Sequence, residues 1–220
     1  MGGKSGKAYF KKLNMKERIL LLSPHTDDVE LGCGASVAKF QENGSEIMNI
    51  LGSSCKESVP NGFKEDAMLT EYHASMSVLG IVEKVFLDLP VRHFPALRQE
   101  ILEAFVKINR EYKPTMVLLP CSNDIHQDHQ TFYNEGLRAF KFCKVLGYEL
   151  PWNMQNSTHS CHVIIEQKHL DKKLESMACY NSQQNRPYFG TQFISHLAKI
   201  RGVQAGGNLA ESFELIKWYL

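Results

Sequence analysis

Apolar strand-like segments alternate with helix-like segments over residues 18–142 of this chain of 220 residues. We expect strands at 18–22, 46–51, 82–87 and 116–119, and helices at 29–42, 63–79, 96–112 and 128–142. Because each helix carries the chain back to the starting edge of the sheet, neighbouring strands can run parallel. The alternation therefore predicts an α/β fold of Rossmann-like type, with a doubly wound, mainly parallel sheet and helices on both faces.

The pattern is less regular after residue 143. We expect later strands at 145–149 and 162–166 and helices at 170–180 and 194–203, whereas 210–219 fits a strand or a helix. No repeat or linker divides the chain, so we predict a single domain over 1–220 with a loose lead-in at 1–15.

Charge and cysteine usage exclude several classes of protein. Lys and Arg total 25 against 24 Asp and Glu, and this balance argues against a nucleic-acid partner. The chain contains no apolar run of about 18 residues, so we expect no membrane span. The six cysteines are scattered without a C-x-x-C pair, and we find no secretory signal. We therefore expect reduced thiols and a cytoplasmic protein, and a homo-oligomer remains open.

Two polar clusters follow strands that should lie side by side in the sheet. Residues 25–30 follow the first predicted strand, and residues 123–129 follow the fourth. Parallel sheets of this kind bind ligands at the carboxyl ends of strands near the point where the strand order reverses. We therefore expect the clusters to face each other across one crevice. Their candidate functional residues are His25, Asp27, Asp28, His126, Asp128 and His129.

These residue types suit an open metal site. Two histidines and one carboxylate leave a coordination position for water on zinc, and a carboxylate outside the metal shell can accept a proton from that water. Iron or cobalt could use the same ligands. Spacing alone leaves open which residue takes which part, although Glu30 is expected to support the start of the helix.

The two clusters resemble the motifs of a known enzyme family. His25-Thr26-Asp27-Asp28 is similar to the His-Pro-Asp-Asp motif of the LmbE-like, or PIG-L-type, zinc-dependent N-acetylglucosamine deacetylases. His126-Gln127-Asp128-His129 is similar to their His-x-Asp-His motif. The resemblance implies a Rossmann-like fold and a Zn²⁺ ion.

The resemblance also implies a role for each matched residue. Its zinc ligands are His25, Asp28 and His129, and its general base is Asp27. His126 would stabilise the oxyanion. We expect Asp128 to serve catalysis by fixing the tautomer of a histidine from behind.

The chain departs from the family pattern in four places. Thr26 and Gln127 stand where proline is common, and Met68 lacks the arginine often found three residues before the glutamate at position 71. Asp124 stands where some relatives have tyrosine. These departures concern loop rigidity and substrate contacts more than the metal chemistry.

Three further residues are candidates for binding substrate. Arg92 and His93 follow the third predicted strand, where they could contact a sugar or a phosphate. The ring of Trp152 could lie under the apolar face of a sugar. Each has an ordinary alternative, since a solvated loop or a packed core would also explain these residue types.

The sequence thus predicts a zinc-dependent hydrolase that removes an N-acetyl group from a small amino sugar or sugar conjugate. One alternative is a zinc amidase acting on another small amide, such as a thiol conjugate or an antibiotic precursor. Another is a non-catalytic sugar- or nucleotide-binding α/β domain. A dinucleotide-binding Rossmann enzyme is disfavoured, because Gly32-Cys33-Gly34 lacks a third glycine at the required spacing.

Overall fold

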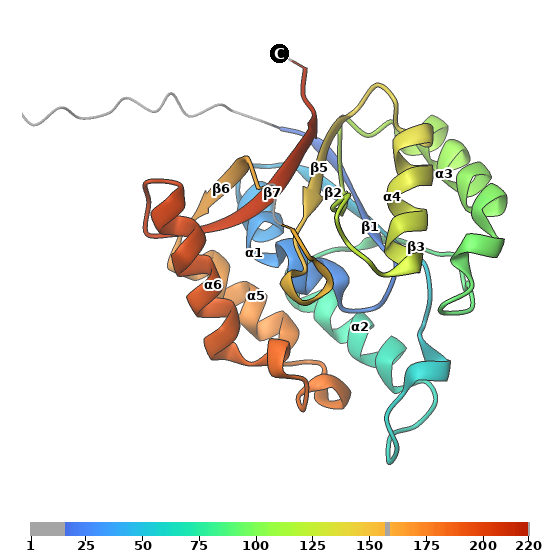
Figure 1. Cartoon of the computed structure of the whole chain (residues 1–220), viewed down its shortest axis with the longest axis horizontal. Helices are drawn as coiled ribbons and strands as arrows, with labels where there is room; N and C mark the ends of the chain where they lie inside the picture. Colours follow the sequence, from blue (N-terminus) through green and yellow to red (C-terminus); the bar gives the residue numbers. More distant parts are fainter. Residues whose placement is uncertain (1–15, 157–158, 220) are drawn as a thin grey trace, which may run out of the picture.

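The computed structural model describes residues 16–156 and 159–219, so the lead-in expected at 1–15 lies outside the described residues. The chain forms a seven-stranded sheet of order β3-β2-β1-β4-β5-β7-β6 (Figure 1). Its strands are β1 (Arg18–Ser23), β2 (Glu46–Leu51), β3 (Glu83–Phe86), β4 (Met116–Pro120), β5 (Lys144–Tyr148), β6 (Cys161–Ile165) and β7 (Leu209–Lys217). The α-helices are α1 (Asp28–Glu42), α2 (Ala67–Leu79), α3 (Arg98–Tyr112), α4 (Gln127–Ala139), α5 (Gln167–Met177) and α6 (Thr191–Gln204).

Strand β1 lies inside the sheet and pairs in parallel with both β2 and β4. Ile19 of β1 pairs with Met116 of β4, so these two strands end side by side. The chain moves outward from β1 to β3 and then crosses back to β4, which places the reversal of strand order between β1 and β4. The predicted α/β, doubly wound fold is therefore confirmed.

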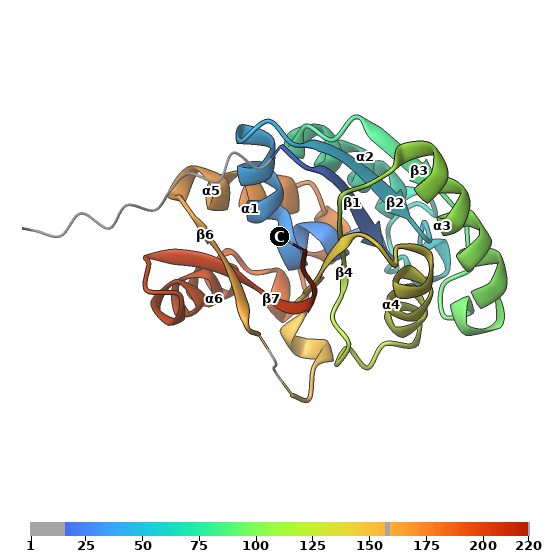
Figure 2. The same ribbon diagram turned by 90° about the horizontal axis from the view of Figure 1, so that it is seen from above.

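The helices cover both faces of this sheet (Figure 2). Ile19 and Leu21 of β1 face the core formed with α1, α2, α5 and α6, while Leu20 and Leu22 face the core formed with α3 and α4. All four side chains are fully buried. Because successive strand residues point to opposite faces, a strand covered on both sides needs an unbroken apolar run.

The C-terminal part completes the sheet in antiparallel fashion. Strand β7 lies between β5 and β6 and runs antiparallel to both, which resolves the segment at 210–219 as a strand. The Glu214 carboxylate accepts hydrogen bonds from the backbone N–H and the hydroxyl of Ser122, each at 2.7 Å. Glu211 pairs with the buried Lys173 of α5 at 2.6 Å. These contacts attach β7 to the loop after β4 and to α5.

Four predicted helices have wrong boundaries, and those expected at 170–180 and 194–203 each begin three residues earlier, at Gln167 and Thr191. The helix expected at 63–79 begins at Ala67, because residues 60–67 form turns in which Phe63 N–H bonds to Pro60 and Ala67 N–H to Lys64. The helix expected at 128–142 ends at Ala139. Beyond it Phe140 is fully buried while Phe142 is 92% exposed. The sequence at 140–142 is still partly apolar, but these residues lie beyond the end of α4.

The glycines at the start of α1 have a packing role. A Cβ atom on Gly32 would lie 2.4 Å from the Tyr148 ring, closer than any real contact allows. The Tyr148 hydroxyl on β5 donates a 2.8 Å hydrogen bond to the Leu22 carbonyl on β1. Gly32 therefore permits close packing of α1 against β5.

All six cysteines are free thiols, and four of them are buried. In the described ranges, no helix has both the length and the apolar character that crossing a bilayer requires.

Candidate metal centre and cleft

The two polar clusters meet at the carboxyl ends of β1 and β4. His25 lies in the loop between β1 and α1, and Asp28 is the first residue of α1. His129 lies in the first turn of α4, which follows the loop after β4. Because β1 and β4 are neighbours in the sheet, the three side chains converge although about 100 residues separate them. The crevice expected from the sequence is present.

The donor atoms of these three residues lie close together. His25 Nδ1 is 3.0 Å from His129 Nε2. The Asp28 Oδ2 atom lies 3.4 Å from His25 Nδ1 and 3.3 Å from His129 Nε2. All three residues are buried or nearly so. Two ring nitrogens and one carboxylate oxygen thus face a common point.

A second carboxylate holds each histidine from behind. Asp128 Oδ2 lies 3.1 Å from His25 Nε2, and Asp124 Oδ2 lies 2.7 Å from His129 Nδ1. Both aspartates are fully buried or nearly so. Such hydrogen bonds place the ring proton on the nitrogen that faces the carboxylate and fix the ring orientation. The structure therefore places Asp128 behind His25, away from the cavity surface.

Charges of the protein itself shift the titration of this cluster. Burial by itself would lower the pKa of His129, but the Asp28 carboxylate and the hydrogen bond to Asp124 outweigh it and raise the pKa to about 10. Burial would raise the pKa of Asp28, but His129 and His25 hold it well below its usual range. The site thus combines strong basicity on the histidines with a firmly ionised carboxylate.

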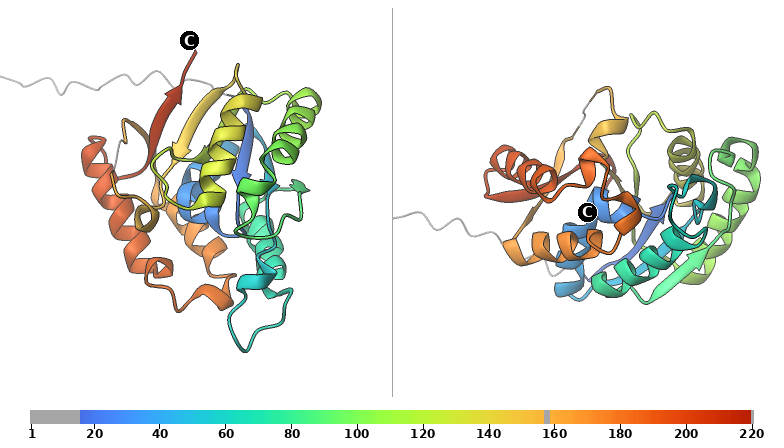
Figure 3. Two further views of the ribbon diagram at one scale, coloured as in Figure 1. Left: turned by 45° about the vertical axis from the view of Figure 1, so that its right-hand side comes forward. Right: turned by 90° about the horizontal axis from the view of Figure 1, so that it is seen from below.

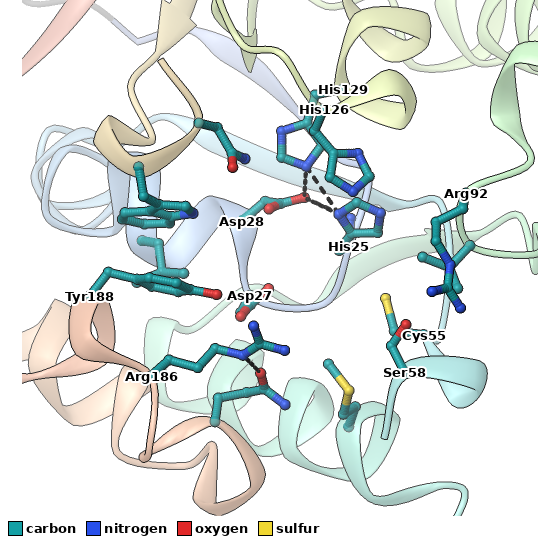
Figure 4. A pocket seen from close by; sticks show the side chains of 16 residues that line it. His25, Asp27, Asp28, Cys55, Ser58, Arg92, His126, His129, Arg186 and Tyr188 are labelled. Carbon is teal, nitrogen blue, oxygen red and sulfur yellow. Dashed lines mark hydrogen bonds and ion pairs between the residues drawn. The ribbon is translucent and has the colours of Figure 1, made fainter. Parts of the chain in front are cut away.

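Asp27 faces the cavity beside this cluster (Figure 4). Its carboxylate makes no capping hydrogen bond to the start of α1. Among the described residues, no basic side chain lies within ion-pair distance of it. Burial, together with the neighbouring Asp28 carboxylate, raises the pKa of Asp27 to about 6. A carboxylate with a pKa near neutrality is suited to accept and return a proton during a reaction.

His126 lines the cavity next to His129, with 4.7 Å between ring centroids. Its Nδ1 atom accepts a 3.2 Å hydrogen bond from the Asp128 backbone N–H at the start of α4. Burial and the charges of His129 and His25 lower the pKa of His126 to about 4, so its ring is neutral at pH 7. Because Nδ1 accepts, the single ring proton lies on Nε2, on the other side of the ring.

The cavity at this end of the sheet has a volume of about 430 Å³. Figure 3 shows the loop after β2 and the segment after α5 at the same end of the molecule as the start of α1. Both segments contribute to the lining, and so does the loop after β5. The lining residues are His25, Asp27, Asp28, Leu31, Cys55, Ser58, Met68, Val91, Arg92, His126, His129, Trp152, Asn153, Gln183, Arg186 and Tyr188.

Two of the three predicted substrate residues line this cavity. Trp152 does so as one half of an aromatic pair, since its ring stacks on Tyr188 with centroids 3.9 Å apart and planes 9° apart. Arg92 also lines it. His93 does not, because Phe94 beside it is fully buried in the core while His93 occupies the exposed side of the turn.

Sequence reasoning did not single out several residues of the site. In the sequence Asp124 stands out only as a departure from the family pattern, although it lies within the second polar cluster at 123–129. Gln183, Arg186 and Tyr188 come from short turns after α5 that have no periodic pattern. A cluster of polar and aromatic residues at 181–188 was the one available signal.

Glu30 was expected to support the start of its helix, but its side chain instead bonds residues of other segments. It is fully buried and accepts hydrogen bonds from Ser75 Oγ and from the Tyr180 hydroxyl, the latter at 2.7 Å. Burial raises the pKa of Glu30 to about 8. It therefore joins α1 to α2 and to the segment after α5, beneath the cavity.

Comparison with known proteins gives the family context. A family model described as "PIG-L: GlcNAc-PI de-N-acetylase" matches residues 20–140. The Escherichia coli K12 protein named uncharacterized deacetylase YaiS is 23% identical over 184 residues, covering 80% of this chain and 96% of that protein.

Solved structures share the fold. N,N'-diacetylchitobiose deacetylase from Pyrococcus horikoshii superposes with a TM-score of 0.77 at 18% identity, covering 90% of this chain and 83% of that one. GalB, a 4-carboxy-2-hydroxymuconate hydratase from Pseudomonas putida KT2440, superposes with a TM-score of 0.76 at 18% identity, covering 92% and 98%. Because a deacetylase and a hydratase both have this fold, the superpositions establish architecture and leave the reaction to the site.

The family match, in contrast, rests on sequence and includes both polar clusters. It spans more than half of the chain and contains the stretches 25–30 and 123–129 that converge on the cavity. This chain therefore belongs to the PIG-L family, the family of GlcNAc-PI de-N-acetylases.

Proposed function

We propose that this protein is a zinc-dependent hydrolase that removes the N-acetyl group from an amino sugar or sugar conjugate. The observation that carries the proposal is the convergence of His25 Nδ1, Asp28 Oδ2 and His129 Nε2, with 3.0 to 3.4 Å between each pair. Tetrahedral zinc with ligand bonds of 2.0–2.2 Å separates its ligand atoms by about 3.3–3.6 Å. The donor set is therefore close to what this ion needs.

The protonation of the histidines supports the same assignment. With one ring proton of each histidine directed at Asp128 or Asp124, the facing nitrogens of His25 and His129 can both present a lone pair to a metal ion. The third group, Asp28 Oδ2, also presents a lone pair. Although burial alone would lower it, the pKa of His129 is raised to about 10 by Asp28 and Asp124, so the protein already stabilises a positive charge between these atoms, and a bound cation would supply that charge.

His126 is a weaker candidate for the third ligand. The nitrogens of His25, His126 and His129 lie within 4.8 Å of one another, which also permits a metal. The set with Asp28 is tighter, and the carboxylate adds a negative charge that balances the ion. We therefore assign His25, Asp28 and His129 as ligands, which leaves His126 free to act on the substrate.

Zinc at this position would supply a Lewis acid and lower the pKa of a water molecule. Asp27 takes the proton that the attacking water loses, since its carboxylate faces the cavity and binds no metal in this assignment. The same proton can then pass to the departing amine nitrogen. The release of acetate and a free amine needs no other proton source.

His126 stabilises the oxygen of the acetyl carbonyl as it gains negative charge. Its Nε2 carries the ring proton and its Nδ1 is held by the backbone of Asp128, so the donor is oriented before substrate binds. A preoriented donor of this kind favours the transition state because it need not reorganise. The stacked pair of Trp152 and Tyr188 offers an apolar surface for a sugar ring.

Acetate release from a panel of N-acetylated sugars tests the proposal. Zinc-loaded protein should release acetate, a chelator should stop the release, and added zinc should restore it. Asp27→Asn should lower kcat by about 10²- to 10⁴-fold because the general base is lost, while zinc per chain stays unchanged.

Asp171→Asn, on the exposed face of α5, makes the same chemical change outside the cavity and should leave kcat unchanged. Full activity of Asp27→Asn would contradict the role of Asp27. Zinc-loaded wild type that releases no acetate from any sugar in the panel would contradict the function.

A further inference from the structure

Two fully buried tyrosines each donate a hydrogen bond to a backbone carbonyl in or just after β1. The Tyr148 hydroxyl bonds to Leu22, which belongs to the strand and is also held by its pairing with β2. The Tyr180 hydroxyl bonds to Thr26, which belongs to neither a strand nor a helix and directly precedes Asp27. The second bond therefore holds a stretch of backbone that the sheet does not hold.

Three other carbonyls at this junction are bound by backbone groups. Those of Ser23 and Pro24 accept from the N–H groups of residues 52–53 after β2, at 2.8 and 3.0 Å. The Asp27 carbonyl accepts from an N–H one turn further along α1, at 3.1 Å. The Thr26 carbonyl is bound instead by a side chain that lies 154 residues further along the chain. The loop between β1 and α1 is thus completed by a contact from the C-terminal part of the molecule.

The hydroxyl of Tyr180 is itself held in place. Its oxygen lies 2.7 Å from Glu30 Oε1, which also accepts a hydrogen bond from Ser75 Oγ of α2. Burial, together with the nearby acidic groups of Glu30 and Asp27, raises the pKa of Tyr180 well above its usual value. The hydroxyl therefore keeps its proton and remains a donor to the loop.

The segment that carries Tyr180 is anchored on α2. Ser182 donates to the Glu71 carboxylate through its hydroxyl at 2.5 Å and through its backbone N–H at 2.9 Å. Glu71 and Ser75 lie one helical turn apart on α2, so they share one face of that helix. The phenol therefore reaches Thr26 from a segment that α2 fixes at two points.

The carboxylate of Asp27 has few contacts of its own to fix it. It makes no capping hydrogen bond, and among the described residues no basic side chain lies within ion-pair distance. Its position therefore depends on the backbone to which it is attached. A general base works only when its oxygen comes within roughly 2.6–3.2 Å of the group that it deprotonates.

We infer that Tyr180 is a positioning residue whose hydroxyl, bound to the Thr26 carbonyl, holds the Asp27 carboxylate where it meets the attacking water. This inference rests on the proposed function, because Asp27 must act as the general base. Tyr180 is fully buried and does not line the cavity. It therefore acts on the reaction through the loop alone.

Tyr180→Phe tests this role, because it removes the hydroxyl and keeps the ring. On the sugar of the panel that is turned over fastest, it should lower kcat by about 10- to 100-fold, as a misplaced catalytic group does. Its KM and its zinc per chain should stay nearly unchanged.

Tyr148→Phe is the matched control, since it removes an equally buried hydroxyl from a carbonyl that the sheet also holds. Denaturant titrations should show that both variants fold and lose stability to a similar extent, while Tyr148→Phe keeps the kcat of wild type. A wild-type kcat in Tyr180→Phe, or equal losses of kcat in the two variants, would overturn the inference.

A double-mutant cycle separates the positioning of Asp27 from a general structural effect. If Tyr180 acts through Asp27, removal of its hydroxyl should no longer matter once the carboxylate is gone. Tyr180→Phe combined with Asp27→Asn should therefore keep the residual kcat of Asp27→Asn. The same fold-loss with and without the Asp27 carboxylate would contradict the positioning role.

Hydrogen exchange gives a readout that needs no activity. The backbone amides of residues 25–28 should exchange faster in Tyr180→Phe than in wild type, and at the wild-type rate in Tyr148→Phe. An unchanged rate in Tyr180→Phe would show that its hydroxyl does not hold the loop. Failure of the wild type to release acetate from any sugar would instead contradict the proposed function, and the contrast in exchange would still decide whether Tyr180 fixes the backbone at Asp27.

Discussion

The two parts of this chain contribute differently to one cavity. Residues 16–142 supply the metal cluster, Asp27 and His126 from two strand–helix junctions of the parallel sheet. Residues 143–219 supply Trp152, Arg186 and Tyr188 from short turns. In the first part, the order of the strands brings the chemical groups together. In the second part, short segments that pack onto the first part form one side of the cavity. The comparison teaches that strand order positions one set of cavity residues and packing of later segments positions another, so under the proposed function the two sets should respond differently to mutation.

The largest effect should follow from removing a ligand in the first part. His129→Ala should lose bound zinc and nearly all activity, because two remaining ligands hold the ion far more weakly. Zinc per chain, measured by elemental analysis after dialysis, checks this. His196→Ala, on the exposed face of α6, should keep both zinc and activity. Retention of stoichiometric zinc by His129→Ala would break the assignment of the ligand set.

A smaller effect should follow from the residue behind that ligand. Asp124→Asn keeps the shape of a side chain that is 1% exposed but weakens its hold on His129 Nδ1. The loss in zinc affinity should be about 10- to 100-fold, measured by competition with a metal-binding dye. Excess zinc should restore most of kcat. A variant with wild-type zinc affinity would show that His129 needs no carboxylate behind it.

The smallest effect on activity should come from an ion pair that holds the second part together. Glu149, after β5, is bound by Arg201 of α6 through two hydrogen bonds of 2.9 and 2.6 Å and pairs with His159 at 2.7 Å. Glu149→Gln should lower the free energy of unfolding at pH 7 by about 1.5–3 kcal/mol. The kcat of the folded enzyme should stay close to that of wild type.

The same variant should change how stability depends on pH. Burial would raise the pKa of Glu149, but His159 and Arg201 outweigh it and lower the pKa below its usual value of 4.5. A lowered pKa contributes stability above the unfolded value and loses it as pH falls through the folded value. The wild type should therefore approach the variant below pH 4.5 in denaturant titrations. Glu175→Gln, on the exposed face of α5, is the control, and a constant difference across pH would contradict the ion pair.

The central sheet was predictable from the sequence because its strands are buried on both faces. An unbroken apolar run such as Leu20-Leu21-Leu22, followed by a helix, is best explained by a strand that is buried on both faces. The meeting of the two clusters followed from strand order alone. What could not be predicted depends on packing between distant segments, such as the hydrogen bonds that Ser182 donates to Glu71 of α2. The direction of the His93 side chain was equally unpredictable, because it depends on the burial of its neighbour Phe94 in the core.

The position of β7 has a consequence for how the molecule assembles during synthesis. Residues 209–217 fill the space between β5 and β6, so the edge of β5 stays unpaired until nearly the whole described chain has been made. An open strand edge can pair with another chain, and contacts between distant residues form slowly. The growing chain is thus most prone to aggregate after the strands and helices around the metal cluster have been made but before β7 completes the sheet. Truncation before residue 209 should leave the edge of β5 permanently exposed.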